Sequence, residues 1–423
     1  MPKILPFRGL HYDWRAADPA SVIAPPYDVI SPSQRADLLA RSPYNSVRLI
    51  LPGGPDDPAR YDSARRTLDE WIRRRLLVRD DEPAFYLYRQ TFDVAGGRRT
   101  RTGFFAAVGL EEFGCGSIFA HEHTLAAPKE DRFRLLSATR TNLSPVLGLL
   151  EDPDSRVSSL LRDVRADAPL SFEEGGARHE FVPLTDPALL RTLVDACASR
   201  AIYIADGHHR YETALRYFRE TGPTPLSADV PRSAVMMLCV PMSDPGLVIL
   251  PTHRVFELPS APRVRDLMRP LAGAMEFDGV VEGDDACAVL AERLRRETGP
   301  PSFGLLADAA SKGVIGRWIA PESDRSCIAG VRLDVLVLHR EIMPLLAPPP
   351  DRCVLYSHEA PEVRAEVARH PARLGVLVRP TPLDSVIRVA RKGERLPPKT
   401  TFFYPKVPTA LVFRPLDENG RRP

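Results

Sequence analysis

The chain has 423 residues, of which 44% are hydrophobic and 26% are charged, a composition typical of a globular protein with two or three domains. Its 57 basic and 55 acidic residues give a formal net charge of +2, which excludes a strongly basic chain of the kind that attracts nucleic acid over long range. The sequence has no apolar run long enough to cross a bilayer and no signal-peptide pattern near its start, so we expect a cytoplasmic protein without a membrane partner.

The six cysteines are scattered, and no two form a CxxC pair. In a reducing compartment this spacing indicates single thiols rather than disulfides or a zinc site.

In the first part of the chain, short apolar runs that read as strands alternate with helical patterns. The predicted strands are 46–51, 84–88, 102–108 and 201–205, and the predicted helices are 58–75, 187–198 and a segment that begins after residue 209. Residues 233–241 and 247–251 flank Asp244-Pro245-Gly246, which predicts a β-hairpin or a close turn.

From residue 262 onward the pattern predicts a compact α/β segment. It contains helices at 264–274, 286–297 and 333–346, paired strands at 302–306 and 313–319, and then a strand at 373–378, a helix at 382–392 and a terminal strand at 409–413. The predicted class is therefore α/β, mixed with α+β. We expect a core domain at 1–258, a smaller α/β domain at 259–350, and a C-terminal segment at 351–423 that packs back on the core.

The most informative motif is Asp206-Gly207-His208-His209-Arg210, which lies between a buried strand and a helix. A glycine turn that opens directly into a helix directs backbone N–H groups and the positive end of the helix dipole at one place. Arg210 adds a planar contact for phosphate. Asp206 is a candidate ligand for Mg²⁺ or a candidate acceptor of a substrate proton.

The segment His121–Arg132 holds seven ionisable groups in twelve positions. If the segment is extended, His121 and His123 share one face and Glu122 takes the other, so the histidines are candidate metal ligands or bases. The motif is not HExxH, because its fifth position is Leu125. A helix is expected after Pro128, and the alternative to a site is a solvated loop followed by a charged first turn.

The segment Ala24–Ile30 presents Tyr27 and Asp28 after two prolines, either as site residues or as a proline turn before a helix capped by Ser31 or Ser33. The run Leu250-Pro-Thr-His-Arg254 has two possible interpretations, a second phosphate contact or a buried hydrogen-bonded pair. The run Pro397–Lys406 contains two lysines and three aromatic residues. This run is interpreted either as an anion clamp or as an edge strand with aromatic packing. If it is an anion clamp, Lys399 is the favoured contact and Lys406 the weaker one.

These five segments, in this order, resemble the bacterial and archaeal family of unknown function DUF1015, whose members carry PPYDV, HExT…PKEDR, DGHHRYETA, LPTHR and KSTxFYPK. The resemblance covers nearly the whole chain. Two mild departures are Thr400 in place of the serine and Pro398 where glutamine is common.

The Gly207–Arg210 loop is also similar to the Gly-Cys-His-Arg loop of sulfiredoxin and to the phosphate-binding loop of ParB-like CTP-binding domains and free serine kinases. This resemblance implies a ParB/sulfiredoxin-like nucleotide-binding core in which Gly207, His208, His209 and Arg210 contact phosphates. The catalytic cysteine of sulfiredoxin aligns with His208, so sulfiredoxin chemistry is excluded.

The leading hypothesis is a small-molecule phosphotransferase that moves a phosphoryl group from ATP, ADP or pyrophosphate to a hydroxyl such as that of L-serine. This chemistry needs positioning, positive charge and a base. No Walker A or protein-kinase loop is present. The expected catalytic residues are Glu122, Asp206, His208 and Asp28, with Mg²⁺ on Asp206. The expected phosphate contacts are Gly207, His208, His209, Arg210, Lys129, Arg132, Arg254 and Lys399, and the expected substrate contacts are Tyr27, His121, His123 and Thr124.

Two alternatives stay open. One is a ParB-like nucleotide switch that binds DNA or a protein, although the near-neutral charge and the lack of a helix-turn-helix count against DNA. The other is a metal-dependent hydrolase that uses His121, His123 and either His208 or His209, although no established metal spacing is met. The sequence leaves the oligomeric state open.

Overall fold

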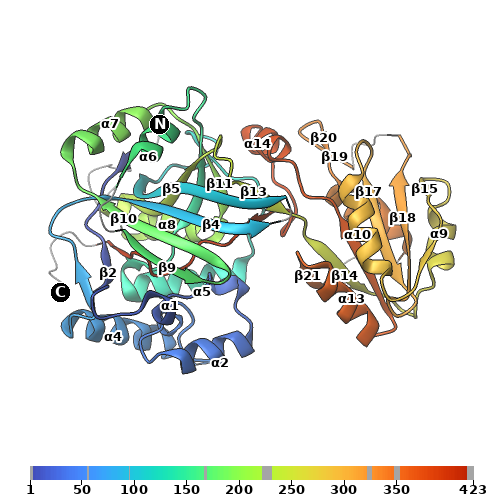
Figure 1. The fold of residues 1–423 in the computed structure, drawn as a ribbon, viewed down its shortest axis with the longest axis horizontal. Coiled ribbons are helices and arrows are strands. Elements are labelled where there is room, and N and C mark those ends of the chain that lie inside the picture. Colours follow the sequence, from blue (N-terminus) through green and yellow to red (C-terminus); the bar gives the residue numbers. More distant parts are fainter. Residues whose placement is uncertain are drawn as a thin grey trace. The chain divides into compact units, whose positions relative to one another are not determined.

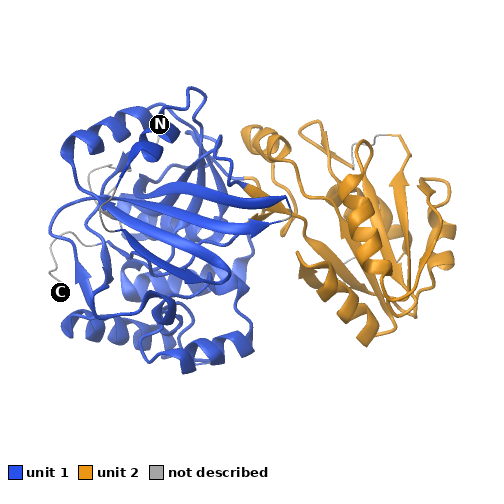
Figure 2. Ribbon diagram, viewed as in Figure 1, with its two compact units in different colours: residues 1–120, 124–247, 405–423 blue, residues 121–123, 248–404 orange. Residues whose placement is uncertain are grey.

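The computed structural model describes residues 3–54, 57–94, 96–165, 169–221, 231–321, 326–346 and 353–416. The chain divides into two compact units (Figure 2). Unit 1 consists of Met1–Ala120, Thr124–Leu247 and Pro405–Pro423, and unit 2 consists of His121–His123 and Val248–Tyr404. The mixed α/β class is confirmed. The division departs from the three expected domains, since within 351–423 only the part from residue 405 onward belongs to unit 1. The expected boundary at 350/351 lies outside the described residues.

Unit 1 is built on a mixed sheet that has nine strands among its described residues, in the order β6-β11-β8-β12-β5-β4-β10-β9, with β1 paired to β5. Figure 1 shows the long strands β4, β5 and β10 of this sheet. Strand β11 is parallel to β6 and antiparallel to β8, while β8 is parallel to β12. The strands are β1 (Ile4–Leu5), β4 (Phe85–Val94), β5 (Gly97–Gly109), β6 (Ile118–Phe119), β8 (Val146–Leu150), β9 (Leu170–Glu174), β10 (Ala177–Leu184), β11 (Ile202–Asp206) and β12 (Ala234–Pro241).

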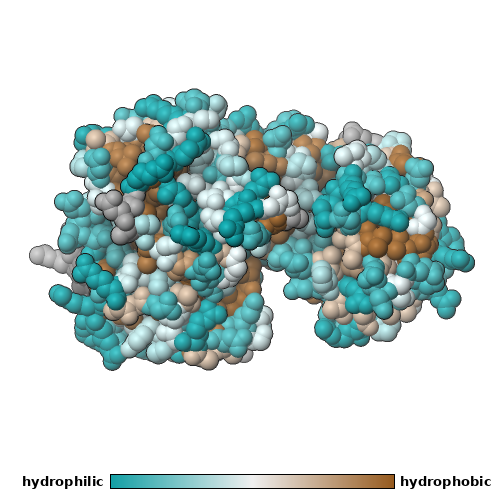
Figure 3. All heavy atoms as spheres, in the orientation of Figure 1, coloured by the Kyte–Doolittle hydropathy of each residue, from teal (hydrophilic) through white to brown (hydrophobic). Residues whose placement is uncertain are grey.

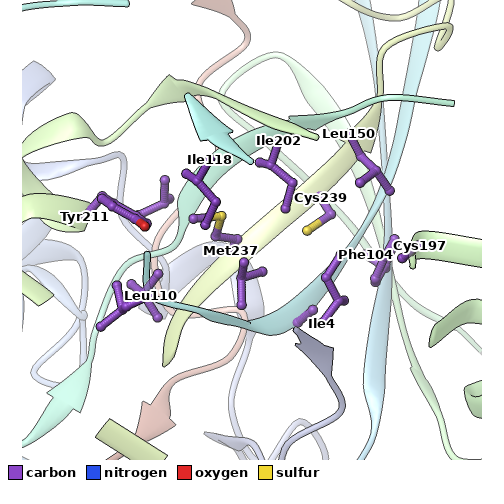
Figure 4. Packing of buried hydrophobic residues seen from close by; sticks show 14 of the residues in the cluster. Ile4, Phe104, Leu110, Ile118, Leu150, Cys197, Ile202, Tyr211, Met237 and Cys239 are labelled. Atoms are coloured by element: carbon purple, nitrogen blue, oxygen red, sulfur yellow. The ribbon is translucent and has the colours of Figure 1, made fainter. Parts of the chain in front are cut away.

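The largest core of unit 1 lies between this sheet and three helices, α6 (Arg156–Asp163), α7 (Pro187–Cys197) and α8 (His208–Thr221). Ile118, Ile202, Met237 and Cys239 meet there (Figure 4), and each is at most 1% exposed. Every residue of β12 is buried, as expected for a central strand that is covered on both faces.

A second core of unit 1 includes residues of five helices and of the short strand pair formed by Leu10–Tyr12 and Leu77–Arg79, and it reaches the residues next to a second pair. Tyr12 and Trp71 pack against each other there, with ring centroids 5.9 Å apart. The helices are α1 (Pro19–Val22), α2 (Pro32–Arg41), α3 (Val47–Ile50), α4 (Arg60–Arg73) and α5 (Ala126–Thr139), a 3₁₀ turn η1 spans Tyr27–Val29, and the strand pairs are β2 (Leu10–Tyr12) with β3 (Leu77–Arg79) and β7 (Thr141–Asn142) with β24 (Arg414–Pro415). Ser31 caps α2 in a capping box with Gln34, which is one of the two caps considered for the residues after Tyr27.

Unit 2 is built on an antiparallel sheet, seven-stranded among its described residues, in the order β15-β18-β17-β22-β14-β21, with β16 paired to β18. Its side chains alternate between two cores, since Leu305 packs toward one and Leu306 toward the other. Helices therefore cover both faces. The strands are β14 (His253–Glu257), β15 (Met275–Phe277), β16 (Val281–Glu282), β17 (Ser302–Ala307), β18 (Lys312–Trp318), β21 (Cys353–Ser357) and β22 (Arg373–Val378).

The other elements of unit 2 lie around this sheet and at its ends. They are α9 (Val264–Leu271), α10 (Ala286–Arg296), α11 (Asp334–Val337), a π-helical turn η3 (Leu338–Ile342), α12 (Met343–Leu346), α13 (Ala360–Arg369) and α14 (Leu383–Arg391), together with the pairs β13 (Val248–Leu250) with β23 (Phe402–Tyr404) and β19 (Cys327–Ile328) with β20 (Val331–Arg332). A 3₁₀ turn η2 (Pro231–Ser233) precedes β12 in unit 1.

Two sequence predictions of local structure are wrong, and a third is confirmed in one of its two forms. The strand expected at 46–51 is the short helix α3, because the buried Asn45 side chain accepts from the N–H of Val47 and starts a helical turn. Of the β-hairpin and the close turn expected around Asp244, the structure has the close turn. The hairpin does not form, since β12 pairs with β5 and β8 while β13 pairs with β23. The terminal strand at 409–413 is replaced by isolated bridges at Thr409 and Phe413.

Polar side chains cover much of the face seen in Figure 3, with apolar patches between them. In the part of the chain that the structure describes, the search for a helix with the length and apolar character of a membrane span finds none.

Candidate functional site

The site in unit 1 is built on the predicted strand, turn and helix. Strand β11 ends at Asp206, Gly207 turns the chain with φ of +88°, and α8 begins at His208. A Cβ at position 207 would lie 2.9 Å from Cζ of Arg210. Glycine therefore serves both the left-handed backbone and the close approach of the guanidinium.

Asp206 joins two cations at this turn. Its Oδ2 accepts a hydrogen bond of 2.6 Å from Nη2 of Arg210, and its Oδ1 accepts one of 2.9 Å from Nζ of Lys406. Burial alone would raise the pKa of Asp206, but the charges of Lys406 and Arg210 outweigh burial and hold the pKa well below its usual range. Asp206 is therefore an ionised anchor between two fixed positive charges.

Two polar side chains on neighbouring strands fix the backbone from which Lys406 extends. Nη2 of Arg101 donates to the Pro405 carbonyl at 2.7 Å, and Nε2 of Gln90 donates to the Lys406 carbonyl at 3.3 Å. Arg101 is 1% exposed, and burial lowers its pKa. The chain near its C-terminal end is thus tied to β4 and β5.

A second carboxylate, Asp131 on α5, is also shared by two cations. Its Oδ1 accepts from Arg60 at 2.7 Å and from the Tyr61 hydroxyl at 2.8 Å, and its Oδ2 accepts from Nε of Arg132 at 2.8 Å. The guanidinium of Arg132 lies 4.1 Å from the centre of the Tyr27 ring, a cation–π geometry. Burial raises the pKa of Tyr27 to about 12, so its hydroxyl keeps its proton at neutral pH.

A cavity of about 50 Å³ lies next to these groups and has one guanidinium from each cluster, Arg132 and Arg210, in its wall. Tyr27 forms part of the same wall. The volume is several times the roughly 10–15 Å³ that a single water needs, and it suits a small group rather than a nucleoside. The other lining residues are Ile50, Leu135, Leu136, Thr141, Asn142, Leu143, Ser144, Thr213 and Val235.

The two histidines of the turn differ in their surroundings. His208 is buried at 6% exposure, and its proximity to Asp206 contributes to the lowering of the pKa of that carboxyl. Nε2 of His209 accepts from the backbone N–H of Leu125 at 2.9 Å, which joins α8 to the residue that precedes α5. This bond requires an unprotonated Nε2 on His209.

Glu212, one turn into α8, gathers two further predicted residues. Its Oε2 accepts from the Thr124 hydroxyl at 2.8 Å and from Nζ of Lys129 at 2.9 Å. Lys129 is thus an ion-pair partner on the surface of α5 and α8, with its side chain 35% exposed.

The segment His121–His123 belongs to unit 2, where it pairs with the chain that follows α14. Glu122 forms a parallel bridge with Leu396, and its Oε1 accepts from the backbone N–H of Lys399 at 3.1 Å. Nε2 of the fully buried His121 lies 3.0 Å from Oγ1 of Thr401. His123 is exposed.

Arg254 is 1% exposed and is held by neutral groups of unit 2. Nη2 donates to the Lys399 carbonyl at 3.1 Å, Nε donates to Nε2 of His339 at 3.3 Å, and Nη1 donates to the Thr252 carbonyl. Burial lowers the pKa of Arg254 to about 10. Of the two possibilities for the LPTHR motif, these contacts favour a buried hydrogen-bonded residue. Glu122 and Arg254 together hold both backbone groups of Lys399, whose φ is +61°.

The predicted site residues thus form two groups. The group in unit 1 consists of Tyr27, Asp28, Thr124, Lys129, Arg132, Asp206, Gly207, His208, His209 and Arg210. In that group, Glu212 joins Thr124 to Lys129, and Asp28 is exposed next to Tyr27. The group in unit 2 consists of His121, Glu122, His123, Arg254 and Lys399.

Sequence reasoning missed Arg60, Arg101 and Glu212, and ranked Lys406 below Lys399. Glu212 could have been predicted from the sequence, since it follows the turn within the same motif. Arg60 and Arg101 had no local signal.

Asp206 does not fit the expected Mg²⁺ role, because both of its oxygens accept hydrogen bonds from cations. Within the described ranges, no group of three or more His, Cys, Asp or Glu side chains is arranged to hold a metal ion. His121 and His123 lie in a different unit from His208 and His209, so the structure describes no shared ligand set for the hydrolase hypothesis.

A family model described as "Protein of unknown function (DUF1015)" matches residues 4–320. The chain belongs to the DUF1015 family. A search of curated proteins gives no significant match to this DUF1015 chain.

Solved structures similar to this DUF1015 protein include free serine kinases. A free serine kinase in complex with AMP is 14% identical, with 68% of this chain and 83% of that chain covered and a TM-score of 0.32. A conserved hypothetical protein from Pyrococcus furiosus is 15% identical (coverage 70% and 92%, TM-score 0.33). SbnI with C-terminal truncation from Staphylococcus aureus is 10% identical (coverage 74% and 87%, TM-score 0.37). Similarity at this level does not assign an activity to this chain.

Proposed function

We propose that this protein is a small-molecule phosphotransferase that binds the phosphates of ATP, ADP or pyrophosphate at the Asp206–Arg210 turn and transfers a phosphoryl group to a hydroxyl. The observation that carries the proposal is the repeated sharing of one carboxylate by two cations. Asp206 is shared by Arg210 and Lys406, and Asp131 is shared by Arg60 and Arg132.

Each of these clusters keeps one positive charge in excess. Arg132 and Arg210 both line one small cavity, and fixed cations beside a restricted cavity stabilise an anion more than solvated ones do. The backbone N–H groups at the start of α8 add partial positive charge at the same turn. These features support binding of phosphate oxygens by Arg210, Lys406 and the Gly207 turn, with His208 and His209 next to them.

Asp206 would act in this site by holding both cations in place rather than by binding a metal. Phosphoryl transfer needs such preorganised charge, because negative charge is spread over the transferred group and the leaving oxygen. We propose Asp28 as the base that takes the proton of the acceptor hydroxyl, since it is exposed and interacts electrostatically with Tyr27. Glu122 lies in unit 2. Its Oε1 accepts the N–H of Lys399, which suits a role in positioning Lys399.

The test is ³¹P NMR of the purified protein with Mg²⁺ and a hydroxyl acceptor, run with ATP, ADP and pyrophosphate in turn. We expect a phosphomonoester signal with wild type and its loss in Arg210→Ala. The matched control is Arg219→Ala, because Arg219 lies on the same helix and pairs with Glu112 at the exposed surface.

Equal activity of Arg210→Ala and wild type would overturn the proposed site. Nucleotide binding that depends on Arg210, without transfer to any acceptor, would instead favour the nucleotide-switch alternative.

A further inference from the structure

We propose that the cavity lined by Arg132 and Arg210 is the acceptor pocket and that it takes a small hydroxy acid without an ammonium group. This inference rests on the proposed phosphotransferase function and goes beyond it by naming the class of acceptor. It departs from the expectation of a free hydroxy amino acid such as L-serine.

The first argument is the charge of the wall. A guanidinium has five N–H donors, and the hydrogen bonds of Arg210 go to Asp206 and to the Pro145 carbonyl. Those of Arg132 go to Asp131 and to the Ile50 carbonyl. Both side chains therefore keep donors for a further oxygen anion, and a carboxylate matches their planar geometry.

Second, the described wall of the cavity offers no carboxylate that could pair with an ammonium group. Among the described residues that line the cavity, none is acidic. The carboxylates behind the two arginines, Asp131 and Asp206, each already accept hydrogen bonds from two cations. An α-ammonium placed in the cavity would meet two guanidinium charges without a neutralising carboxylate among the lining residues, and like charges at short range repel each other.

The third argument is an unused hydroxyl in the wall. Thr213 lies on α8, is 3% exposed, and its Oγ1 has no hydrogen-bond partner among the described residues. By contrast, the hydroxyl of Ser144 lies 3.0 Å from that of Thr409, and the hydroxyl of Thr141 donates to the Thr139 carbonyl. A buried polar atom without a partner is costly, and an oxygen of a bound ligand would supply the missing partner.

The remaining wall limits the size of the ligand. Leu135, Leu143 and Val235 give the cavity an apolar side, and its volume is about 50 Å³. A carboxylate on a skeleton of two or three carbons satisfies the arginines, Thr213 and this apolar side together. In the transfer step, the acceptor hydroxyl oxygen forms the new bond to phosphorus and its proton passes to Asp28, which follows Tyr27 of the wall in the sequence and is not itself a lining residue. The bond from phosphorus to the leaving oxygen of the donor breaks, and its electron pair stays on that oxygen.

The experiment is calorimetric titration of the full-length protein with glycerate, which is serine with its ammonium replaced by a hydroxyl, and with L-serine, propionate and inorganic phosphate. We expect glycerate to bind at least about tenfold more tightly than L-serine. Thr213→Val should weaken glycerate binding about tenfold, the loss of one hydrogen bond to a buried group. Thr221→Val, at the exposed end of the same helix, should leave it unchanged.

Equal or tighter binding of L-serine would overturn the proposal, as would the absence of glycerate binding by a protein that still binds ADP. Displacement of glycerate by low inorganic phosphate would also overturn it, because the cavity would then be a phosphate subsite. Glycerate binding that depends on Thr213, without phosphoryl transfer in the ³¹P experiment, would keep the ligand class and reject the proposed reaction.

Discussion

Lys406 places its ammonium 2.9 Å from the Asp206 carboxylate, although the two residues are 200 positions apart in the sequence. The contact brings the last stretch of unit 1, which begins at Pro405, to the Asp206–Arg210 turn. It makes Lys406 a direct member of the site, supported from behind by Arg101 and Gln90.

Replacing Lys406 by methionine should weaken binding of ADP and pyrophosphate about tenfold to a hundredfold, because one charge-assisted contact to phosphate is lost. Calorimetric titration measures the change. Lys312→Met is the control, since Lys312 pairs with Glu282 on the surface of unit 2. Unchanged binding in Lys406→Met would show that this lysine serves the fold alone.

Gly207→Ala should abolish ADP binding and lower the free energy of unfolding by about 1–3 kcal/mol, the cost of a left-handed backbone at a residue with a side chain. The loss of binding follows from the clash with Arg210. Gly393→Ala separates the two effects, because Gly393 has φ of +71° but nothing within 4 Å of a built Cβ. Chemical denaturation and titration of both variants measure the effects. Retained binding in Gly207→Ala would contradict the argument.

Tyr27→Phe should bind glycerate as wild type does, whereas Tyr27→Ala should bind it several-fold more weakly. The ring supports the guanidinium of Arg132 at 4.1 Å, and such contacts contribute about 0.5–2 kcal/mol. The hydroxyl is not required for this support. A large loss in Tyr27→Phe would instead assign the phenol a direct contact with the ligand.

Unit 2 should lose stability as the pH falls from about 6.5 to about 4. Burial lowers the pKa of both His253 and His339 to about 4. Each ring nitrogen also accepts a hydrogen bond, from the N–H of Val378 and from Nε of Arg254 respectively. In this window the unfolded chain binds more protons than the folded one. The free energy of unfolding therefore decreases as the pH is lowered, by on the order of 3 kcal/mol per histidine.

Thermal unfolding followed by circular dichroism between pH 7.5 and pH 4.5 tests this dependence. His339→Gln keeps an acceptor for Arg254 and should flatten the profile. Asp206 adds no slope above about pH 5, because its pKa is lowered in the folded state and the ordinary Asp pKa of about 3.9 leaves it ionised in the unfolded state as well. An unchanged profile in His339→Gln would assign the acid sensitivity to other groups.

The local part of the site could be predicted from the sequence. An apolar run, a glycine and a helical pattern of apolar residues define β11, the turn and α8, and the structure has all three. The same reasoning failed at 46–51, where β-branched and leucine residues suggested a strand. There the side chain of Asn45 also donates to the carbonyls of Ser21 and Ile23, so tertiary contacts decide the backbone.

The long-range part of the site could not be predicted. The contacts of Asp131 with Arg60 and of Asp206 with Lys406 depend on how distant segments pack, and periodicity within one segment carries no signal for them. The same limit explains the failed hairpin at Asp244, since β13 pairs with a strand more than 150 residues later in the chain.

Residues 121–123 belong to unit 2 but lie in the sequence between two stretches of unit 1. No single cut in the coding sequence therefore yields the two units as separate fragments. A fragment that starts at residue 248 would lack Glu122 and hence the acceptor for the N–H of Lys399. A fragment that stops at residue 320, where the family model ends, would lack β22, the strand that joins β14 to β17. A cut at residue 248 or at residue 320 therefore separates residues that contact each other within unit 2. Truncations, deletions and domain exchanges should keep the chain whole.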